Sequence, residues 1–271
     1  MPKVAIVAAL EREVSGLTKS WNRLEQEYEG RRFVFFERDE MVVVCGGIGV
    51  EAARRAAEAV IALHRPALVQ SVGFAGALHA GLRVGDVFAP SAVIDARDGS
   101  RVEIEVERGD GQAQGQAQGP RLLVTFMAVA EGQQKANLAQ AYGAQAVDME
   151  AAAVAAAARA HGIRFGATKV ISDEWNFEMP GMARFIAANG RFRTASFALF
   201  VALRPWLWRR VAMLASNSRK AAKVLGEHLE RFRRELSQAP GHASEKIAAP
   251  PAARPTPQVA AAGGLNAGSR E

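Results

Sequence analysis

The chain has 271 residues, a formal net charge of +6 and one cysteine, Cys45. This length can bury one large core, and no apolar run approaches the length of a membrane-spanning helix. A single cysteine excludes an internal disulfide framework and a multi-cysteine metal site, and Cys45, at the end of an apolar run, is expected to be a buried structural thiol. The N-terminus lacks the architecture of a signal peptide, so we expect a cytoplasmic protein.

The first half of the chain alternates strand-like and helix-like segments. Helical spacing of apolar residues predicts helices from residue 11 to about 20 and from 50 to about 64. A glycine-rich segment, residues 73–77, follows the fourth predicted strand. Short apolar or alternating runs predict strands at residues 3–9, 32–38, 41–45, 67–72, 87–94 and 101–107, with a hairpin turn at 39–40.

The second half begins with a low-complexity stretch, residues 109–119, that cannot build a core and is expected to be a flexible loop. Residues 237–271 are dominated by Ala, Pro and Gly and are expected to form a disordered tail after a domain spanning 1–236. Between them the sequence predicts a strand at 121–128, a short helix at 133–141, a strand–helix–strand unit over 146–173, a loop or lid at 174–194, and helices at 195–203 and 206–232 broken at Pro205.

Strands alternating with helices are typical of an α/β fold. We expect three layers, α/β/α, with a mixed, largely parallel central sheet and helices on both of its faces.

Acidic residues follow several of the predicted strands. Glu150 and Asp173 lie at the two strand exits of the unit at 146–173, whose strands we expect to be neighbouring and parallel because one helix crosses between them. Glu13 follows the first strand. In an open α/β sheet, ligands bind beyond the carboxyl ends of the strands, so these carboxylates are expected to face one pocket. Each also has a structural interpretation, because Glu13 could lie on a solvated helix face and Glu150 could favour the positive end of its helix.

Four short segments carry a resemblance to a known family: residues 4–14, 73–86, 147–151 and 171–173. They resemble the purine nucleoside phosphorylase/uridine phosphorylase superfamily, and the pattern is most similar to methylthioadenosine/S-adenosylhomocysteine nucleosidases. The resemblance extends over about residues 1–232. It implies cleavage of the N-glycosidic bond of an adenine nucleoside through an oxocarbenium-like transition state, with water as the nucleophile and no cofactor.

The resemblance also implies roles for individual residues. Asp173 matches the residue that helps to protonate the purine at N7, and Ser172 would orient its carboxyl group. Glu150 matches the residue that hydrogen-bonds the ribose hydroxyls, and Met149 would pack against the sugar. Glu13 matches the carboxylate that holds and activates the attacking water.

The glycine-rich segment, Gly73, Phe74, Ala75 and Gly76, would complete the substrate site, but it departs from the nucleosidase pattern. Those enzymes carry Ser where this chain has Phe74, which could form a pocket wall or pack in the core. Asp148 likewise stands where the nucleosidases usually carry Glu. The loop after the first strand carries two carboxylates, Glu11 and Glu13, which would repel a phosphate dianion unless Arg12 turned inward. This favours hydrolysis over phosphorolysis.

The segment from residue 203 to 222 resembles the C-terminal part of hopanoid-associated phosphorylases, which are thought to act on adenosylhopane. Trp206 and Trp208 beside arginines would suit a peripheral membrane contact, or the segment could be an ordinary C-terminal helix. The alternatives therefore remain a phosphorylase or nucleosidase acting on adenosylhopane, a phosphorolytic purine nucleoside phosphorylase, and a catalytically idle binding protein.

The expected partners are a small-molecule nucleoside and further copies of the chain, as a homodimer or larger, without nucleic acid. No metal is expected, because the five histidines show no ligand spacing. Residues 129–137, where the family places its base-stacking aromatic, contain no aromatic side chain, so that role is left unassigned.

Overall fold

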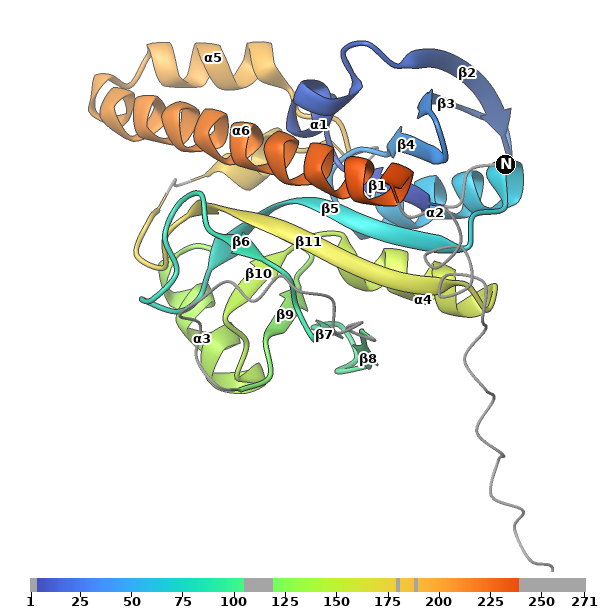
Figure 1. Ribbon diagram of the computed structural model, residues 1–271. Coiled ribbons are helices and arrows are strands. Elements are labelled where there is room, and N and C mark those ends of the chain that lie inside the picture. The colour runs from blue at the N-terminus through green and yellow to red at the C-terminus, as the bar shows by residue number, and fades with distance from the viewer. Residues whose placement is uncertain (1–3, 105–118, 179–180, 188–189, 239–271) are drawn as a thin grey trace, which may run out of the picture.

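The structure is a computed structural model that describes residues 4–104, 119–178, 181–187 and 190–238. Within these residues, an 11-stranded sheet lies between two layers of helices (Figure 1). The strands are β1 (Val4–Ala8), β2 (Asn22–Tyr28), β3 (Arg31–Arg38), β4 (Met41–Cys45), β5 (Leu68–Ala77), β6 (Val87–Phe88), β7 (Ala92–Asp95), β8 (Arg101–Glu103), β9 (Leu122–Thr125), β10 (Ala146–Asp148) and β11 (Arg164–Asp173).

Helices connect most of these strands and follow the last one. They are α1 (Glu11–Thr18), α2 (Val50–His64), α3 (Gly132–Tyr142), α4 (Ala151–Ala160), α5 (Thr194–Ala202) and α6 (Trp208–Gln238), with short 3₁₀ turns η1 (Met182–Phe185) and η2 (Pro205–Leu207). The predicted three-layer α/β/α class with a mixed sheet is confirmed.

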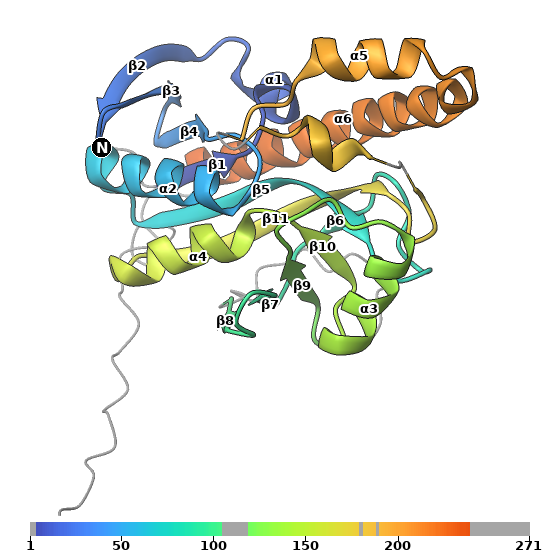
Figure 2. The same cartoon turned by 180° about the vertical axis from the view of Figure 1, so that it is seen from behind.

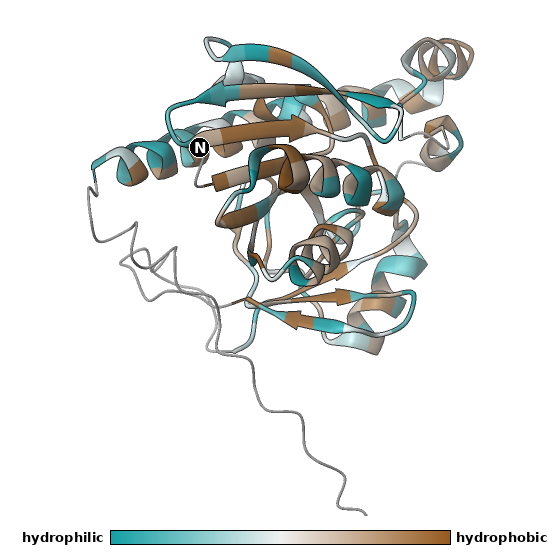
Figure 3. Cartoon of the chain, turned by 90° about the vertical axis from the view of Figure 1, so that its right-hand side faces the viewer, coloured by the Kyte–Doolittle hydropathy of each residue, from teal (hydrophilic) through white to brown (hydrophobic). Residues whose placement is uncertain are grey.

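The helical layers bury the two faces of the sheet separately. On one face, α2 and α4 pack alanine-rich surfaces against β1, β4 and β5 (Figure 2). On the other face, α1 and α6 cover β1, β4 and β11 with a cluster that includes Leu17 and Leu225. Helices α1 and α6 approach closely where Gly16 meets Gly226, since a Cβ on Gly226 would lie 3.6 Å from the Cα of Gly16. The central strands are largely hydrophobic (Figure 3).

The sheet branches at β5. One edge of β5 pairs with β1 in parallel and then, at its end, with β10 in antiparallel orientation, and the other edge pairs with β11 in parallel. The expectation that β10 and β11 are neighbouring parallel strands is therefore wrong. Strands β10 and β11 run in opposite directions and lie on the two edges of the end of β5. Their acidic ends therefore meet there. Register places Val147 on one side of Gly76 and Asp173 on the other.

Several predicted boundaries need correction. The glycine-rich segment lies inside β5 and does not follow it, and the run at 87–94 is split into β6 and β7 around Ala89 and Pro90. Strand β2 was not predicted, because its sequence is mostly polar and it forms an exposed edge paired with β3. The break at Pro205 is confirmed, and α6 continues to Gln238.

Parts of three predictions lie outside the described residues: most of the loop at 109–119, the end of the strand at 101–107 and the tail from 239 onward. Cys45 is a free thiol and is only partly buried. Among the helices described, none is both long enough and apolar enough to cross a membrane.

Candidate active site

Two glycines of β5 leave the space that two carboxylates occupy. Gly73 has a φ of +141°, and a Cβ built on it would lie 3.0 Å from Oε2 of Glu13. A Cβ on Gly76 would lie 2.8 Å from Oδ2 of Asp173. The end of β5 is thus the surface on which residues from the first and middle thirds of the chain meet, and glycine permits this close approach.

Glu13 lies in the first turn of α1, directly after β1. Its carboxylate accepts a hydrogen bond from the backbone N–H of Leu10 at 3.3 Å, and the residue is 5% exposed. The structure therefore excludes the solvated helix face as its location. Burial raises the pKa of Glu13, although the Leu10 N–H and the Lys169 ammonium oppose this shift.

Glu150 ends the segment that follows β10 and is the N-cap residue of α4. Its Oε1 accepts a hydrogen bond from the backbone N–H of Gly49 at 2.8 Å, which ties β10 to the start of α2. Burial, and then the neighbouring Asp148 carboxylate, raise the pKa of Glu150 to about 7, while Lys169 opposes the rise. Met149, the preceding residue, lines the cavity that Glu13 and Glu150 also border.

Beneath these carboxylates lies a fully buried ion pair. The ammonium of Lys169, in the middle of β11, is 2.8 Å from Oδ2 of Asp148 and 2.9 Å from Oγ of Ser71. Although burial disfavours the ammonium, the carboxylates of Asp148, Glu150 and Glu13 raise the pKa of Lys169 above its ordinary value. Lys169 was not predicted as a site residue, although a lysine inside an otherwise apolar strand is a signal that could have identified it.

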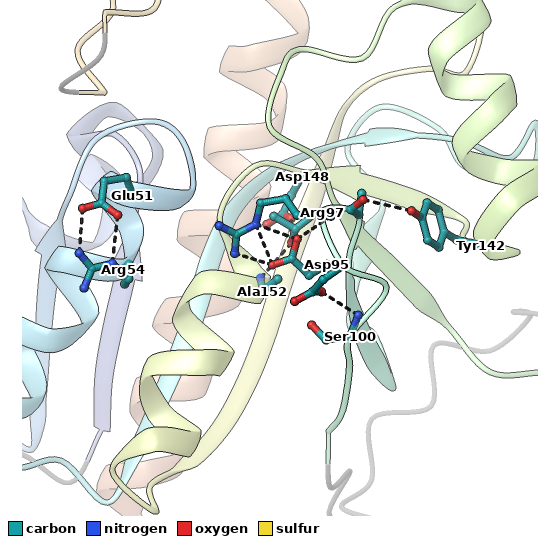
Figure 4. Close-up of polar contacts among 11 residues, drawn as sticks. Glu51, Arg54, Asp95, Arg97, Ser100, Tyr142, Asp148 and Ala152 are labelled. Atoms are coloured by element: carbon teal, nitrogen blue, oxygen red, sulfur yellow. Dashed lines mark hydrogen bonds and ion pairs between the residues drawn. The ribbon is translucent and has the colours of Figure 1, made fainter.

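Asp148 is the hub of a polar network at the start of α4. It accepts hydrogen bonds from Thr125 Oγ1 at 2.6 Å and from the backbone N–H of Ala151 at 2.9 Å. Thr125 in turn accepts one from the N–H of Ala152, which lies beside Asp148 in Figure 4. Asp148 is therefore a structural anchor that orients the residues following it, Met149 and Glu150.

Asp173 is held from two sides. Oγ of Ser172 donates to Oδ1 at 2.8 Å, as the resemblance implied, and Lys135 of α3 forms an ion pair with Oδ2. The Lys135 ammonium also donates to the backbone oxygen of Glu174 at 2.7 Å, and its side chain is almost fully buried. Lys135 was not selected from the sequence, because a lysine in a short, polar helix carries no distinguishing pattern.

The four carboxylates, Lys135 and Ser172 line one cavity of about 510 Å³. Of the predicted site residues, all but Gly73 border it, and Gly73 shapes it by making room for Glu13. Phe74 forms part of the wall and also packs against the α1–α6 core cluster. Arg12 borders the cavity as well.

Another wall of the cavity is formed by residues between 182 and 222. The segment predicted as a loop or lid contributes residues that include Phe192, and α5 contributes Phe197. These aromatics face the cavity, although residues 129–137 supply none. Helix α6 adds the wall residues Val211, Leu214, Ala215, Ser218, Arg219 and Ala222.

A mixed sheet whose branched central strand gathers carboxylates from three strand ends, covered by helices on both faces, defines the nucleoside phosphorylase type of α/β protein. The chain belongs to the Phosphorylase superfamily, whose sequence profile matches residues 3–128 and 123–203. This membership confirms the predicted superfamily and, at that level, the prediction of an enzyme.

Individual relatives agree with this assignment. A curated 5'-methylthioadenosine/S-adenosylhomocysteine nucleosidase from Buchnera aphidicola is 29% identical over 91 residues, which are 32% of this chain. The match spans only 39% of that relative's length.

Solved structures show the same fold at low sequence identity. A Helicobacter pylori nucleosidase of this kind, with 5'-methylthioadenosine in its active site, aligns with a TM-score of 0.57 at 16% identity, covering 85% of this chain and 99% of that one. Futalosine hydrolase from the same organism aligns with a TM-score of 0.57 at 17% identity, covering 85% and 98%.

Proposed function

We propose that the protein hydrolyses the N-glycosidic bond of an adenine nucleoside and releases adenine, with a 5'-substituted adenosine such as methylthioadenosine as substrate. The observation that carries this proposal is the convergence of Glu13, Glu150 and Asp173 around the end of β5, in one cavity. The curated nucleosidase relative and the fold shared with nucleosidases support it.

In this proposal each of the three carboxylates has a separate role in the reaction. Glu13 accepts a proton from the attacking water, whose oxygen forms a bond to C1' of the ribose as the C1'–N9 bond breaks. Asp173 helps to deliver a proton to N7, so that adenine leaves as a neutral base. Glu150 accepts hydrogen bonds from the ribose hydroxyls. Burial that raises the pKa of Glu13 makes it a stronger base at neutral pH.

Lys135 and Ser172 act as positioning residues for Asp173. Their contacts occupy one carboxylate oxygen each, which fixes the plane of the carboxyl group. A group held in this way delivers or accepts a proton along one direction, which reduces the reorganisation needed during the reaction. Lys169 acts as a positioning residue for Glu13 and Glu150, because its positive charge stabilises carboxylates that lie close together.

Phosphorolysis is a second candidate, and two arginines favour it. Arg12 and Arg219 both border the cavity, and guanidinium groups are common phosphate ligands. Against it, Glu13 shares that region, and a buried carboxylate repels a phosphate dianion. The two reactions differ in their sugar product, which is the free sugar from hydrolysis and the sugar 1-phosphate from phosphorolysis.

A lipid-linked adenosine is an alternative substrate for the same chemistry. The cavity wall built by α5 and α6 is largely apolar, and a long apolar 5' substituent could extend along it. Futalosine hydrolase shares the fold, so a third kind of 5' substituent also belongs in the substrate panel.

The test is release of the purine base, followed by chromatography, from methylthioadenosine, S-adenosylhomocysteine, adenosine and futalosine, each with and without phosphate. Asp173→Asn should lower turnover by about 10²–10⁴-fold, the usual range for general acid catalysis. Asp98→Asn, at an exposed turn outside the cavity, is the matched control and should retain activity. No release from any of the four nucleosides would contradict the small-substrate form of the proposal, and dependence on phosphate would replace hydrolysis by phosphorolysis.

A further inference from the structure

Helix α5 and the turn after it leave large apolar side chains uncovered. Helix α5 is rich in Phe, Leu and Ala, yet none of its residues is buried. The side chains of Leu199, Leu203, Trp206, Trp208 and Met213 are 50% to 72% exposed. We call these five residues the apolar patch; the described residues have only three other exposed side chains of this kind, which lie elsewhere in the chain. All five lie between residues 199 and 213, and exposed apolar side chains gathered in this way mark an interaction site.

The segment that carries the apolar patch has charged residues of one sign. Residues 181–226 contain no Asp or Glu, and their basic residues are Arg184, Arg191, Arg193, Arg204, Arg209, Arg210, Arg219, Lys220 and Lys223. Arg209 and Arg210 lie directly beside Trp208 and are exposed. This segment therefore combines exposed apolar side chains with positive charge, and its Lys223 pairs with Glu227, one residue beyond it.

The apolar patch is held in place by its own contacts. The indole N–H of Trp208 donates to the backbone oxygen of Val201 at 3.0 Å, which fixes the start of α6 against the end of α5. The Arg204 guanidinium stacks 3.9 Å from the centre of the Phe200 ring. Phe185 packs under α5 against Phe197 and Phe200. In Figures 1 and 2, α5 and the first half of α6 run side by side at one end of the molecule.

We infer that the apolar patch and the basic residues around it dock on an anionic bilayer surface. Trp at a headgroup interface, with Leu and Met inserted below it and Arg around it, is the composition of interfacial helices. Positive charge is attracted to anionic headgroups. A second copy of this chain is a poorer occupant, because a two-fold interface would place the same arginines against one another.

Docking on a bilayer would bring the cavity close to the lipid. Thr194 and Phe197 of α5, and Val211 and Leu214 of α6, line the cavity on elements that also carry the apolar patch. An apolar substrate could therefore pass between bilayer and cavity along these helices. The docking itself does not depend on the proposed reaction, and it can be measured without any substrate.

The experiment is co-sedimentation of the full chain with phosphatidylcholine vesicles, with and without 30% phosphatidylglycerol (about a third anionic lipid, enough to give a strong surface potential). The wild type should bind the anionic vesicles at least tenfold more tightly than the neutral ones, and added salt should weaken this binding. Equal binding to both kinds of vesicle, or no binding, would overturn the inference.

Two pairs of variants locate the surface. Leu203→Ser with Trp206→Ser should reduce binding at least tenfold, and neither side chain has a hydrogen bond whose loss would unfold the helices. Trp175→Ser removes an equally large exposed side chain elsewhere and should bind like the wild type. Arg209→Glu with Arg210→Glu should abolish binding.

A second pair of arginines controls for overall charge. Arg32→Glu with Arg159→Glu changes the net charge by the same amount on β3 and α4, away from the apolar patch, and should reduce binding far less. Equal losses in the two charge pairs would show that net charge alone drives binding. Conversion of a dimer to a monomer by the Leu203 and Trp206 changes, without vesicle binding by the wild type, would assign the face to a second copy instead.

Discussion

Replacing Glu150 by Gln should make the protein more stable at alkaline pH while impairing the proposed site. The pKa of Glu150 is raised from 4.5 to about 7, first by burial and then by the Asp148 carboxylate. A carboxyl group whose pKa is raised in the folded state contributes stability that is complete below its unfolded pKa. That contribution is lost as the pH rises through the folded pKa.

The size of the effect follows from the raised pKa. At roughly 1.4 kcal/mol per pH unit, a rise from 4.5 to about 7 corresponds to about 3 kcal/mol. The wild type should therefore lose about this much free energy of unfolding from this group between pH 4.5 and pH 8. A glutamine keeps a carbonyl oxygen to accept the hydrogen bond from Gly49 and carries no charge, so the variant should not incur this loss.

The assay is urea unfolding at pH 4, 6 and 8. The variant should match the wild type at pH 4 and exceed it by about 3 kcal/mol at pH 8. Glu27→Gln, on the exposed strand β2, is the matched control and should show no such divergence. A Glu150→Gln protein that is no more stable than the wild type at pH 8 would refute the reasoning. Adenine release by the variant should fall at the same time, because an amide clamps the ribose hydroxyls less strongly than a carboxylate.

Three further substitutions test the supports of the site. Gly76→Ala places a Cβ 2.8 Å from Oδ2 of Asp173 and should lower adenine release at least tenfold, whereas Gly119→Ala, with no atom within 4 Å, should not. Lys169→Met leaves a buried carboxylate unpaired and should lower the free energy of unfolding by about 3–5 kcal/mol in urea titrations; a loss below about 1 kcal/mol would contradict the ion pair. Lys135→Met should reduce kcat at least tenfold with little change in KM, and Lys135→Arg should recover part of it; a rise in KM alone would make Lys135 a binding residue.

Local patterns in the sequence were sufficient for most of the regular elements. Helix α2 begins and ends where its apolar spacing predicts, because a helix buries one face whatever lies opposite it. Strand β2 was not predicted, because burial does not determine its sequence. It is an exposed edge, and its position is set by hydrogen bonds to β3 and not by burial.

Spacing along the chain also placed the three carboxylates correctly at strand ends, but for a partly mistaken reason. The strand–helix–strand unit was expected to bring Glu150 and Asp173 together through neighbouring parallel strands. In the structure both flank the end of β5, and β10 pairs with β5 in antiparallel orientation. Strand direction depends on pairings between distant segments, which no local pattern encodes.

The amino-acid sequence by itself determined the fold class and superfamily, the three acidic residues and the glycine-rich segment, because each rests on residue types at short separations. Only the tertiary structure decided which cations pair with Asp173 and with Asp148, the residue two positions before Glu150. Lys135 and Lys169 lie 38 and 21 residues from their partners, Asp173 and Asp148, and each is buried by strands and helices from other parts of the chain. A buried lysine is stable only where a carboxylate faces it, and that pairing exists only once the whole sheet has formed.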